Sequence, residues 1–214
     1  MKICTVTPQN DIRKTDLCKS LTHLDIDIDL HGVIDNTESI SEIYNQLIDR
    51  YQDEDYLILC HDDVTLKSDP RPIIEMYLKT NDMLGVAGAT NCHVTEPCLW
   101  HIMGGEGNLR GNVEHGTVDN HISTFFGPTP AQVINLDGVF VVLSKKLMQS
   151  GLRYDEDIPS KFHFYDIDFS LRAWREGFKP LAINIPLIHA SGGLKSLDDE
   201  EFLKGQTYFK NKHG

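Results

Sequence analysis

Strand-like and helix-like segments alternate over the first 90 residues, and this order restricts the possible folds more than any other feature of the 214-residue chain. Residues 24–30 read LDIDIDL, a period of two, whereas residues 39–51 carry apolar side chains at helical spacing. Residues 56–60 form a wholly apolar run, which is typical of a strand buried on both faces. The order predicts an α/β fold with a mostly parallel sheet flanked by helices. Further strands are expected at residues 3–7 and 84–89, and a further helix at residues 72–78.

Residues 91–131 interrupt this alternation. They are rich in Gly, His, Asn and Thr and contain no long periodic segment. An irregular insertion of this length is usually functional or forms hairpins of its own. Regular patterns then return, with strands expected at 139–143 and 180–188 and helices at about 166–176 and 198–208.

The charge of the chain excludes several classes of partner. The 20 Lys and Arg residues stand against 32 Asp and Glu residues, which gives a formal net charge of -12. Nucleic-acid binders and proteins that dock on anionic lipid gain affinity from Lys and Arg, so neither class fits. A phosphate-bearing ligand held through a divalent metal remains compatible with this charge.

The sequence is expected to belong to a cytoplasmic protein without a transmembrane segment. No stretch approaches the roughly 20 apolar residues that a membrane span needs, and the N-terminus reads as a first strand rather than a signal peptide. The five cysteines are odd in number and lack CxxC spacing, which favours reduced thiols. Cys4 and Cys60 lie in strand-like runs and are expected in the core.

Acidic residues and two histidines follow expected strands or begin an expected strand or helix. His61, Asp62 and Asp63 follow the apolar run, where open parallel sheets bind ligands and where two carboxylates suit Mg²⁺ or Mn²⁺. A solvated turn explains them equally well. His189 follows a later strand and is either a buried hydrogen-bonding residue or, beside carboxylates, a metal ligand. Asp137 begins a strand and either binds a hydroxyl or closes a turn.

Asp166 and Asp168 lie at the start of an expected helix. Aspartate is favoured there because it caps the helix and complements its dipole. A carboxylate in this place can also act as a general base. Histidines within the insertion match no zinc pattern and are interpreted as loop residues. They are His93, His101, His115 and His121.

The order of these motifs resembles the GT-A glycosyltransferases of the large inverting family two, in particular its glycosyltransferase-like subgroup. The resemblance runs from the first strand to about Lys195. It is carried by YNQ (44–46), YLILCHDDV (56–64), LDGVFVVLSKKL (136–147), FHFYDIDFSLRAWREG (162–177) and IHASGG (188–193). His61 replaces the first Asp of the Asp-x-Asp motif, and Tyr165 replaces the Glu before the catalytic Asp.

The resemblance implies a single GT-A, Rossmann-like domain over residues 1–214. Residues 1–90 would form the nucleotide-binding half, 91–195 the acceptor and catalytic half, and 196–214 a C-terminal tail. The implied enzyme is a metal-dependent inverting glycosyltransferase of the hexosyltransferase type. Its donor is a nucleotide diphosphate sugar, with a UDP-sugar favoured, and its acceptor a hydroxyl of a glycan, a lipid-linked glycan or a protein.

The same resemblance implies roles for individual residues. Asp166 would be the catalytic base, and Asp168 would orient it or cap the helix. Asp63 and His189 would hold Mn²⁺ or Mg²⁺. The residues implied in donor binding are Thr5, Thr7, Pro8, His61, Asp62, Asp137, Gly138 and Lys195.

Other functions remain open on the sequence. A sugar-phosphate nucleotidyltransferase shares the sheet architecture but needs a glycine-rich basic loop after the first strand, and residues 7–11 contain no glycine. A catalytically silent nucleotide- or carbohydrate-binding module is compatible with the changes at His61 and Tyr165. A metal-dependent hydrolase could use the same carboxylates.

Overall fold

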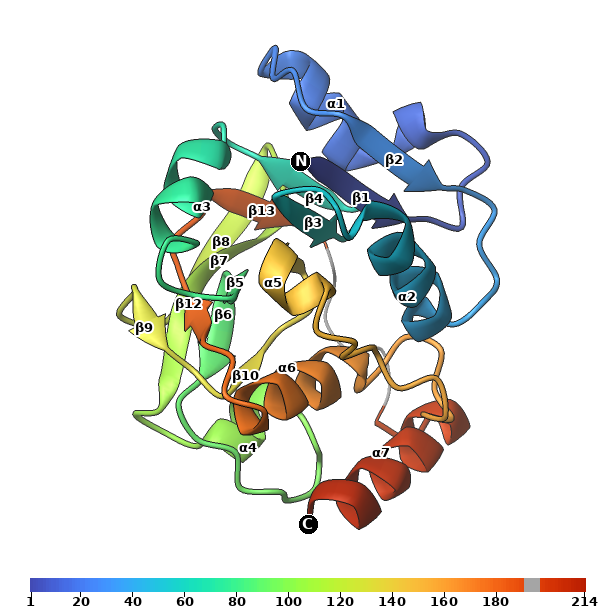
Figure 1. The fold of residues 1–214 in the computed structure, drawn as a ribbon, viewed down its shortest axis with the longest axis vertical. Coiled ribbons are helices and arrows are strands. Elements are labelled where there is room, and N and C mark those ends of the chain that lie inside the picture. Colours follow the sequence, from blue (N-terminus) through green and yellow to red (C-terminus); the bar gives the residue numbers. More distant parts are fainter. Residues whose placement is uncertain (191–196) are drawn as a thin grey trace.

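The computed structural model describes residues 1–190 and 197–214. Within these ranges the central sheet has seven strands. Five of them run in one direction, because β1 pairs in parallel with β2 and β3, while β5 and β12 pair in parallel beyond the antiparallel β11. The predicted largely parallel sheet is therefore confirmed (Figure 1). In sheet order the strands are β2 (Leu30–Val33), β1 (Lys2–Val6), β3 (Tyr56–Cys60), β11 (Phe140–Ser144), β5 (Met83–Gly85), β12 (Pro180–Ala182) and β9 (Ala131–Gln132).

A second sheet of six strands in the described residues continues from the first. Four chain segments leave the central sheet and enter the second one within a few residues: β3 leads to β4, β5 to β6, β9 to β10 and β12 to β13. The junction between the two sheets therefore collects the residues that follow these central strands. In order, the second sheet contains β10 (Asn135–Leu136), β6 (Ala87–Ala89), β7 (Leu109–Thr117), β13 (Leu187–His189) and β4 (Val64–Leu66), with β8 (Asn120–Gly127) paired to β7.

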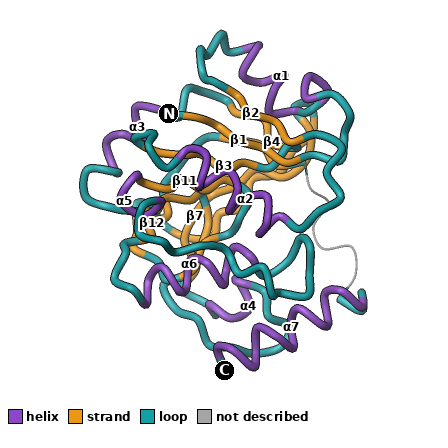
Figure 2. Tube along the Cα trace, turned by 45° about the vertical axis from the view of Figure 1, so that its right-hand side comes forward, coloured by secondary structure: helices purple, strands orange, loops and turns teal. Residues whose placement is uncertain are grey.

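Helices cover the sheets because each central strand buries both faces. In β3, Ile58 and Cys60 pack in one apolar cluster while Leu57 and Leu59 pack in the other. The helices α6 and α7 lie side by side at the end of the molecule opposite α1 (Figures 1 and 2). The helices are α1 (Asp16–His23), α2 (Ile40–Tyr51), α3 (Arg71–Tyr77), α4 (Trp100–Gly104), α5 (Lys145–Met148), α6 (Tyr165–Arg175) and α7 (Glu200–His213), with a 3₁₀ turn at Ile12–Lys14.

The prediction of a strand over residues 24–30 is wrong. The strand begins only at Leu30, because Leu24 caps α1 and Asp25 adopts a left-handed conformation with φ of 49°. The peptide N–H of Ile28 then bonds to the carbonyl of Ile26, so the chain turns locally instead of pairing. Ile28 is nevertheless buried, and this loop produces the apolar alternation that resembled a strand.

Four further segments differ from the expectation. The strand expected at 180–188 is divided between β12 and β13, which belong to different sheets. The insertion at 91–131 holds α4 and the long antiparallel hairpin of β7 and β8, as the alternative of local hairpins allowed. The apolar run at 84–89 is divided between β5 and β6, which belong to different sheets. The C-terminal helix extends to His213, and Phe202 and Phe209 lie in the main core. Cys4 and Cys60 are buried as predicted.

Candidate active site

The site lies at the junction of the two sheets. The backbone N–H of His61 bonds to the carbonyl of Val139, which ties the end of β3 to the start of β11. On the other side, β13 pairs with β4 so that His189 lies opposite Val64, and the N–H of Ala190 bonds to the carbonyl of Asp63. Residues more than a hundred positions apart in the sequence thus converge through backbone pairing.

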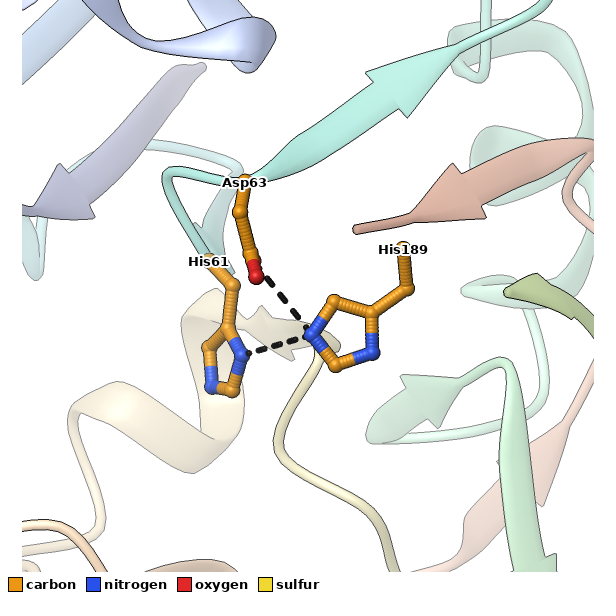
Figure 3. A group of neighbouring side chains, drawn as sticks. All are labelled: His61, Asp63 and His189. Carbon is orange, nitrogen blue, oxygen red and sulfur yellow. Dashed lines mark hydrogen bonds and ion pairs between the residues drawn. The ribbon is translucent and has the colours of Figure 1, made fainter. Parts of the chain in front are cut away.

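His61, Asp63 and His189 form one cluster of side chains (Figure 3). One donor atom from each lies within 4.8 Å of the others. His189 Nε2 is 3.3 Å from Asp63 Oδ1 and 3.4 Å from His61 Nδ1. The structure therefore brings together the two residues expected at a metal, Asp63 and His189, and adds His61, which had been expected only in donor binding.

The environment of the cluster favours ligation of a cation. Burial lowers the pKa of His61, and the neighbouring His189 lowers it further, so the ring is held neutral with a lone pair available. For Asp63, burial opposes ionisation, but the hydrogen bond and charge of His189 bring its pKa below the usual value. An ionised carboxylate and a neutral imidazole are metal donors, so Asp63 and His61 are both suited to ligation.

Tyr165 fixes the far side of the His61 ring. Its hydroxyl lies 2.8 Å from His61 Nε2, and the tyrosine is buried. Space for this contact depends on Gly138, because a Cβ at that position would lie 2.3 Å from the Tyr165 hydroxyl oxygen. The sequence analysis had noted His61 and Tyr165 only as two separate departures from a motif.

Asp166 follows Tyr165 at the start of α6. The helix begins after Phe164, which has a left-handed φ of 70°, and the backbone N–H of Gly138 donates to Asp166 Oδ2 over 2.9 Å. The Ser170 hydroxyl links the helix to β10 by donating to the Asp166 carbonyl and accepting from the N–H of Leu136. Burial and, next, the charge of Asp137 raise the pKa of Asp166 to about 7.

Asp137 lies at the electrostatic centre of the site. Its carboxylate accepts the N–H of Val139 over 2.9 Å, as a turn-closing aspartate does. Its charge acts to raise the pKa values of five surrounding groups, and at the histidines it opposes the larger effect of burial. These groups are His61, His101, His115, Tyr165 and Asp166. Asp137 is therefore near enough to act on both the histidine cluster and Asp166.

The expected nucleotide side lies at the end of β1. Thr5 and Thr7 are fully buried, while Pro8 is exposed. The Thr7 hydroxyl donates to Asp62 Oδ2 over 2.5 Å, so Asp62 faces β1. The Thr5 hydroxyl has no hydrogen-bond partner within the described part of the chain. Lys195 lies outside the described residues.

Asp168 lies in the first turn of α6, as expected. Its carboxylate is buried and contacts Arg172 Nε at 2.8 Å, Lys212 Nζ at 2.6 Å and His213 Nε2 at 2.8 Å. Burial opposes its ionisation, yet these partners lower its pKa to about 2. Asp168 thus joins α6 to α7 through an ion network. Its expected role of orienting Asp166 or capping the helix stays a prediction.

Comparison with known proteins supports the fold and gives a family. The sequence model described as "Glycosyltransferase like family" matches residues 11–210. A search among curated proteins finds no significant match. No helix in the described ranges is long and apolar enough to cross a membrane.

Two solved structures share the fold. A197 from STIV superposes with a TM-score of 0.52 at 10% identity, covering 94% of this chain and 100% of that one. S. aureus TarS also gives a TM-score of 0.52 at 10% identity, with 100% of this chain matched to 43% of that one. At this identity the likeness concerns the fold alone.

Proposed function

Because the chain belongs to the glycosyltransferase-like family, we propose that it transfers a sugar from a nucleotide diphosphate sugar to a hydroxyl acceptor, with inversion at C1. The observation that carries this proposal is the position of Asp166. Asp166 follows Tyr165 in the sequence, and the Tyr165 hydroxyl contacts His61 of the cluster formed with Asp63 and His189. The pKa of Asp166 is raised to about 7. A general base works best when its pKa lies near the operating pH.

The cluster supplies a fitting place for a divalent cation, because it combines a carboxylate with imidazoles in one small space. Asp63 and His189 would hold the ion, with His61 beside them. Such a cation, when bound, neutralises negative charge on a diphosphate leaving group. This neutralisation matters because the chain itself has a net charge of -12 and would repel the diphosphate.

In the proposed reaction Asp166 accepts the proton of the acceptor hydroxyl. The hydroxyl oxygen forms a bond to C1 of the sugar while the bond from C1 to the diphosphate oxygen breaks, and the nucleoside diphosphate leaves. A single displacement of this kind inverts the anomeric carbon. The N–H of Gly138 holds one carboxylate oxygen of Asp166, which keeps the base oriented without using a side chain.

The remaining residues complete the donor site in this proposal. Thr5, Thr7 and Pro8 border the nucleotide at the end of β1, with Asp62 held toward them by Thr7. Asp137 and Gly138 face the sugar. Residues 1–90 would then form the nucleotide-binding half and residues 91–195 the acceptor and catalytic half. A UDP-sugar is the favoured donor.

Replacing Asp166 tests the proposal. We expect Asp166→Asn to lower the rate of sugar transfer by about 10²–10⁴-fold, the usual contribution of a general base. Donor affinity measured by calorimetry should stay within a few-fold, because the amide keeps the size of the side chain. The matched control is Asp157→Asn, which changes an exposed aspartate. Transfer by Asp166→Asn at the wild-type rate would remove Asp166 from the mechanism.

The donor itself can be identified by thermal shift. Nucleoside diphosphates and nucleotide sugars are tested with and without Mn²⁺, and the correct ligand stabilises the fold by RT ln(1 + [L]/Kd). If no nucleotide raises the melting temperature under either condition, the proposed donor class is wrong.

A further inference from the structure

We propose that His61 is itself a metal donor, through Nδ1, and that the resulting set of two imidazoles and one carboxylate makes the site prefer a transition-metal ion to Mg²⁺. This inference rests on the metal site of the proposed function and specifies its chemistry. The first observation is the mutual distance of the donor atoms. His189 Nε2 lies 3.4 Å from His61 Nδ1 and 3.3 Å from Asp63 Oδ1.

These separations suit donors that share one ion. Metal–nitrogen bonds of about 2.1 Å place neighbouring donors roughly 3.0 Å apart in an octahedral arrangement and roughly 3.4 Å apart in a tetrahedral one. Figure 3 shows the three side chains pointing toward one another from the end of β3, the start of β4 and the end of β13. His61 therefore meets the same geometric condition as the two residues expected to bind metal.

The second observation is the contact between His61 and Tyr165. Metal-ligating histidines characteristically use the other ring nitrogen in a hydrogen bond, which fixes the tautomer and the ring orientation. Here Nε2 lies 2.8 Å from the Tyr165 hydroxyl. With Nε2–H donating to that oxygen, the lone pair of Nδ1 faces His189 and Asp63. Tyr165 is thus a positioning residue for His61.

The third observation concerns Asp62. Two adjacent aspartates could have formed an oxygen-rich site suited to Mg²⁺. Instead, the Asp62 carboxylate accepts the Thr7 hydroxyl over 2.5 Å and is directed toward β1. The donors that remain in the cluster are two nitrogens and one oxygen. Imidazole favours Mn²⁺, Co²⁺ or Zn²⁺ over Mg²⁺, which prefers oxygen ligands in an octahedron.

Metal-binding calorimetry on the full chain tests the preference. Mg²⁺, Mn²⁺ and Co²⁺ are titrated with and without uridine diphosphate. We expect the wild type to bind Mn²⁺ and Co²⁺ at least about tenfold more tightly than Mg²⁺. His61→Asp restores a carboxylate at the first position of the motif, and it should reduce the ratio of Co²⁺ to Mg²⁺ affinity several-fold.

Tyr165→Phe tests the positioning role without removing a donor. Loss of a hydrogen bond to a ligating histidine typically costs about 10–100-fold in metal affinity. We expect a loss in this range for Co²⁺, together with a changed visible absorption spectrum of the bound ion. Tyr154→Phe is the matched control, since Tyr154 is also buried and its ring lies 6.0 Å from that of Tyr165.

The outcomes separate this inference from the proposed function. If the wild type binds metal but His61→Asp and Tyr165→Phe leave both the affinities and the spectrum unchanged, His61 is not a donor, while sugar transfer through Asp166 still stands. If Mg²⁺ binds as tightly as Co²⁺, the preference is refuted. Transfer by Asp166→Asn at the wild-type rate would instead refute the proposed role of Asp166, whatever the metal measurements show. Circular dichroism of each variant identifies one that has not folded, in which case the other variant decides.

Discussion

Asp166 and Asp168 are two residues apart on α6, yet they lie in opposite electrostatic environments. Burial and the charge of Asp137 raise the pKa of Asp166 to about 7. Asp168 is also buried, but His213, Arg172 and Lys212 lower its pKa to about 2. One carboxylate is therefore able to exchange a proton near neutral pH, whereas the other is a permanent anion. Both residues lie in the first turn of α6, so the difference between their pKa values comes from the neighbouring charged groups.

The raised pKa of Asp166 predicts the pH dependence of transfer. A general base works only when ionised, so kcat/KM should fall as pH decreases through about 7. Asp137→Asn removes a negative charge near Asp166 and should lower that pKa, which moves the acidic limb of the profile to lower pH. The midpoint of this limb is compared at one saturating Mn²⁺ concentration with that of Asp157→Asn. A limb that stays in place would show that Asp137 does not act on the base.

The residues of the site differ in how far the sequence could predict them. Asp63 and His189 were paired through the resemblance to the glycosyltransferase-like family, and the structure places both near strand ends, Asp63 beyond β3 and His189 as the last residue of β13. The contact of His61 with Tyr165 spans 104 positions and depends on how α6 enters the site, which no local pattern encodes. The ion pairs of Asp168 could not be predicted for the same reason, since its partners Lys212 and His213 belong to a helix distant in the sequence.

At the level of elements, α7 fixes the start of α6. Phe202 and Phe209 of α7 pack near Phe164, and a Cβ at Gly205 would lie 2.6 Å from the ring of Phe164. Lys212 and His213 then contact Asp168 in the first turn of α6. Because Phe164 immediately precedes Tyr165, the C-terminal helix supports the segment that carries the proposed base.

Asp168→Asn should therefore destabilise the protein. The pKa decrease from 3.8 to about 2 represents about 2 kcal/mol, and breaking a buried ion pair typically costs about 3–5 kcal/mol, so we expect a loss of about 2–5 kcal/mol near pH 7. The contribution of a carboxylate with a lowered pKa is present above pH 3.8 and disappears as pH falls through about 2. The loss is measured by urea unfolding of Asp168→Asn, with Asp157→Asn as the control. Equal unfolding midpoints for the two variants would contradict a stabilising network.

The element boundaries show which sequence patterns were sufficient to predict a helix or a strand. The helices α2 and α6 were predicted because burial of one helix face leaves apolar residues at a regular spacing. The strand β3 was predicted because burial of both faces leaves a continuous apolar run. The division of residues 84–89 between two sheets was not predictable. Val86 is buried like its neighbours, so composition does not mark the point where the pairing partners change.

At the level of the whole molecule, the net charge of -12 opposes the binding of an anionic donor. Without a divalent ion, affinity for uridine diphosphate should increase with NaCl concentration, because salt screens repulsion over a Debye length of about 10 Å at 0.1 M. With Mn²⁺ present this increase should be smaller. Calorimetry in EDTA and in Mn²⁺ at several salt concentrations provides the comparison. A decrease of affinity with salt in EDTA would mean that cationic side chains dominate the site.

The passage of four segments from one sheet into the other has a consequence for biosynthesis. His61 and His189 meet across 128 positions, so the site exists only after the chain has been synthesised beyond His189 and both sheets have joined. A growing chain could present its early strands but no ligand-binding centre. Nucleotide capture would then coincide with the completion of folding, and a ligand added to a refolding mixture would report the last step of assembly rather than the first.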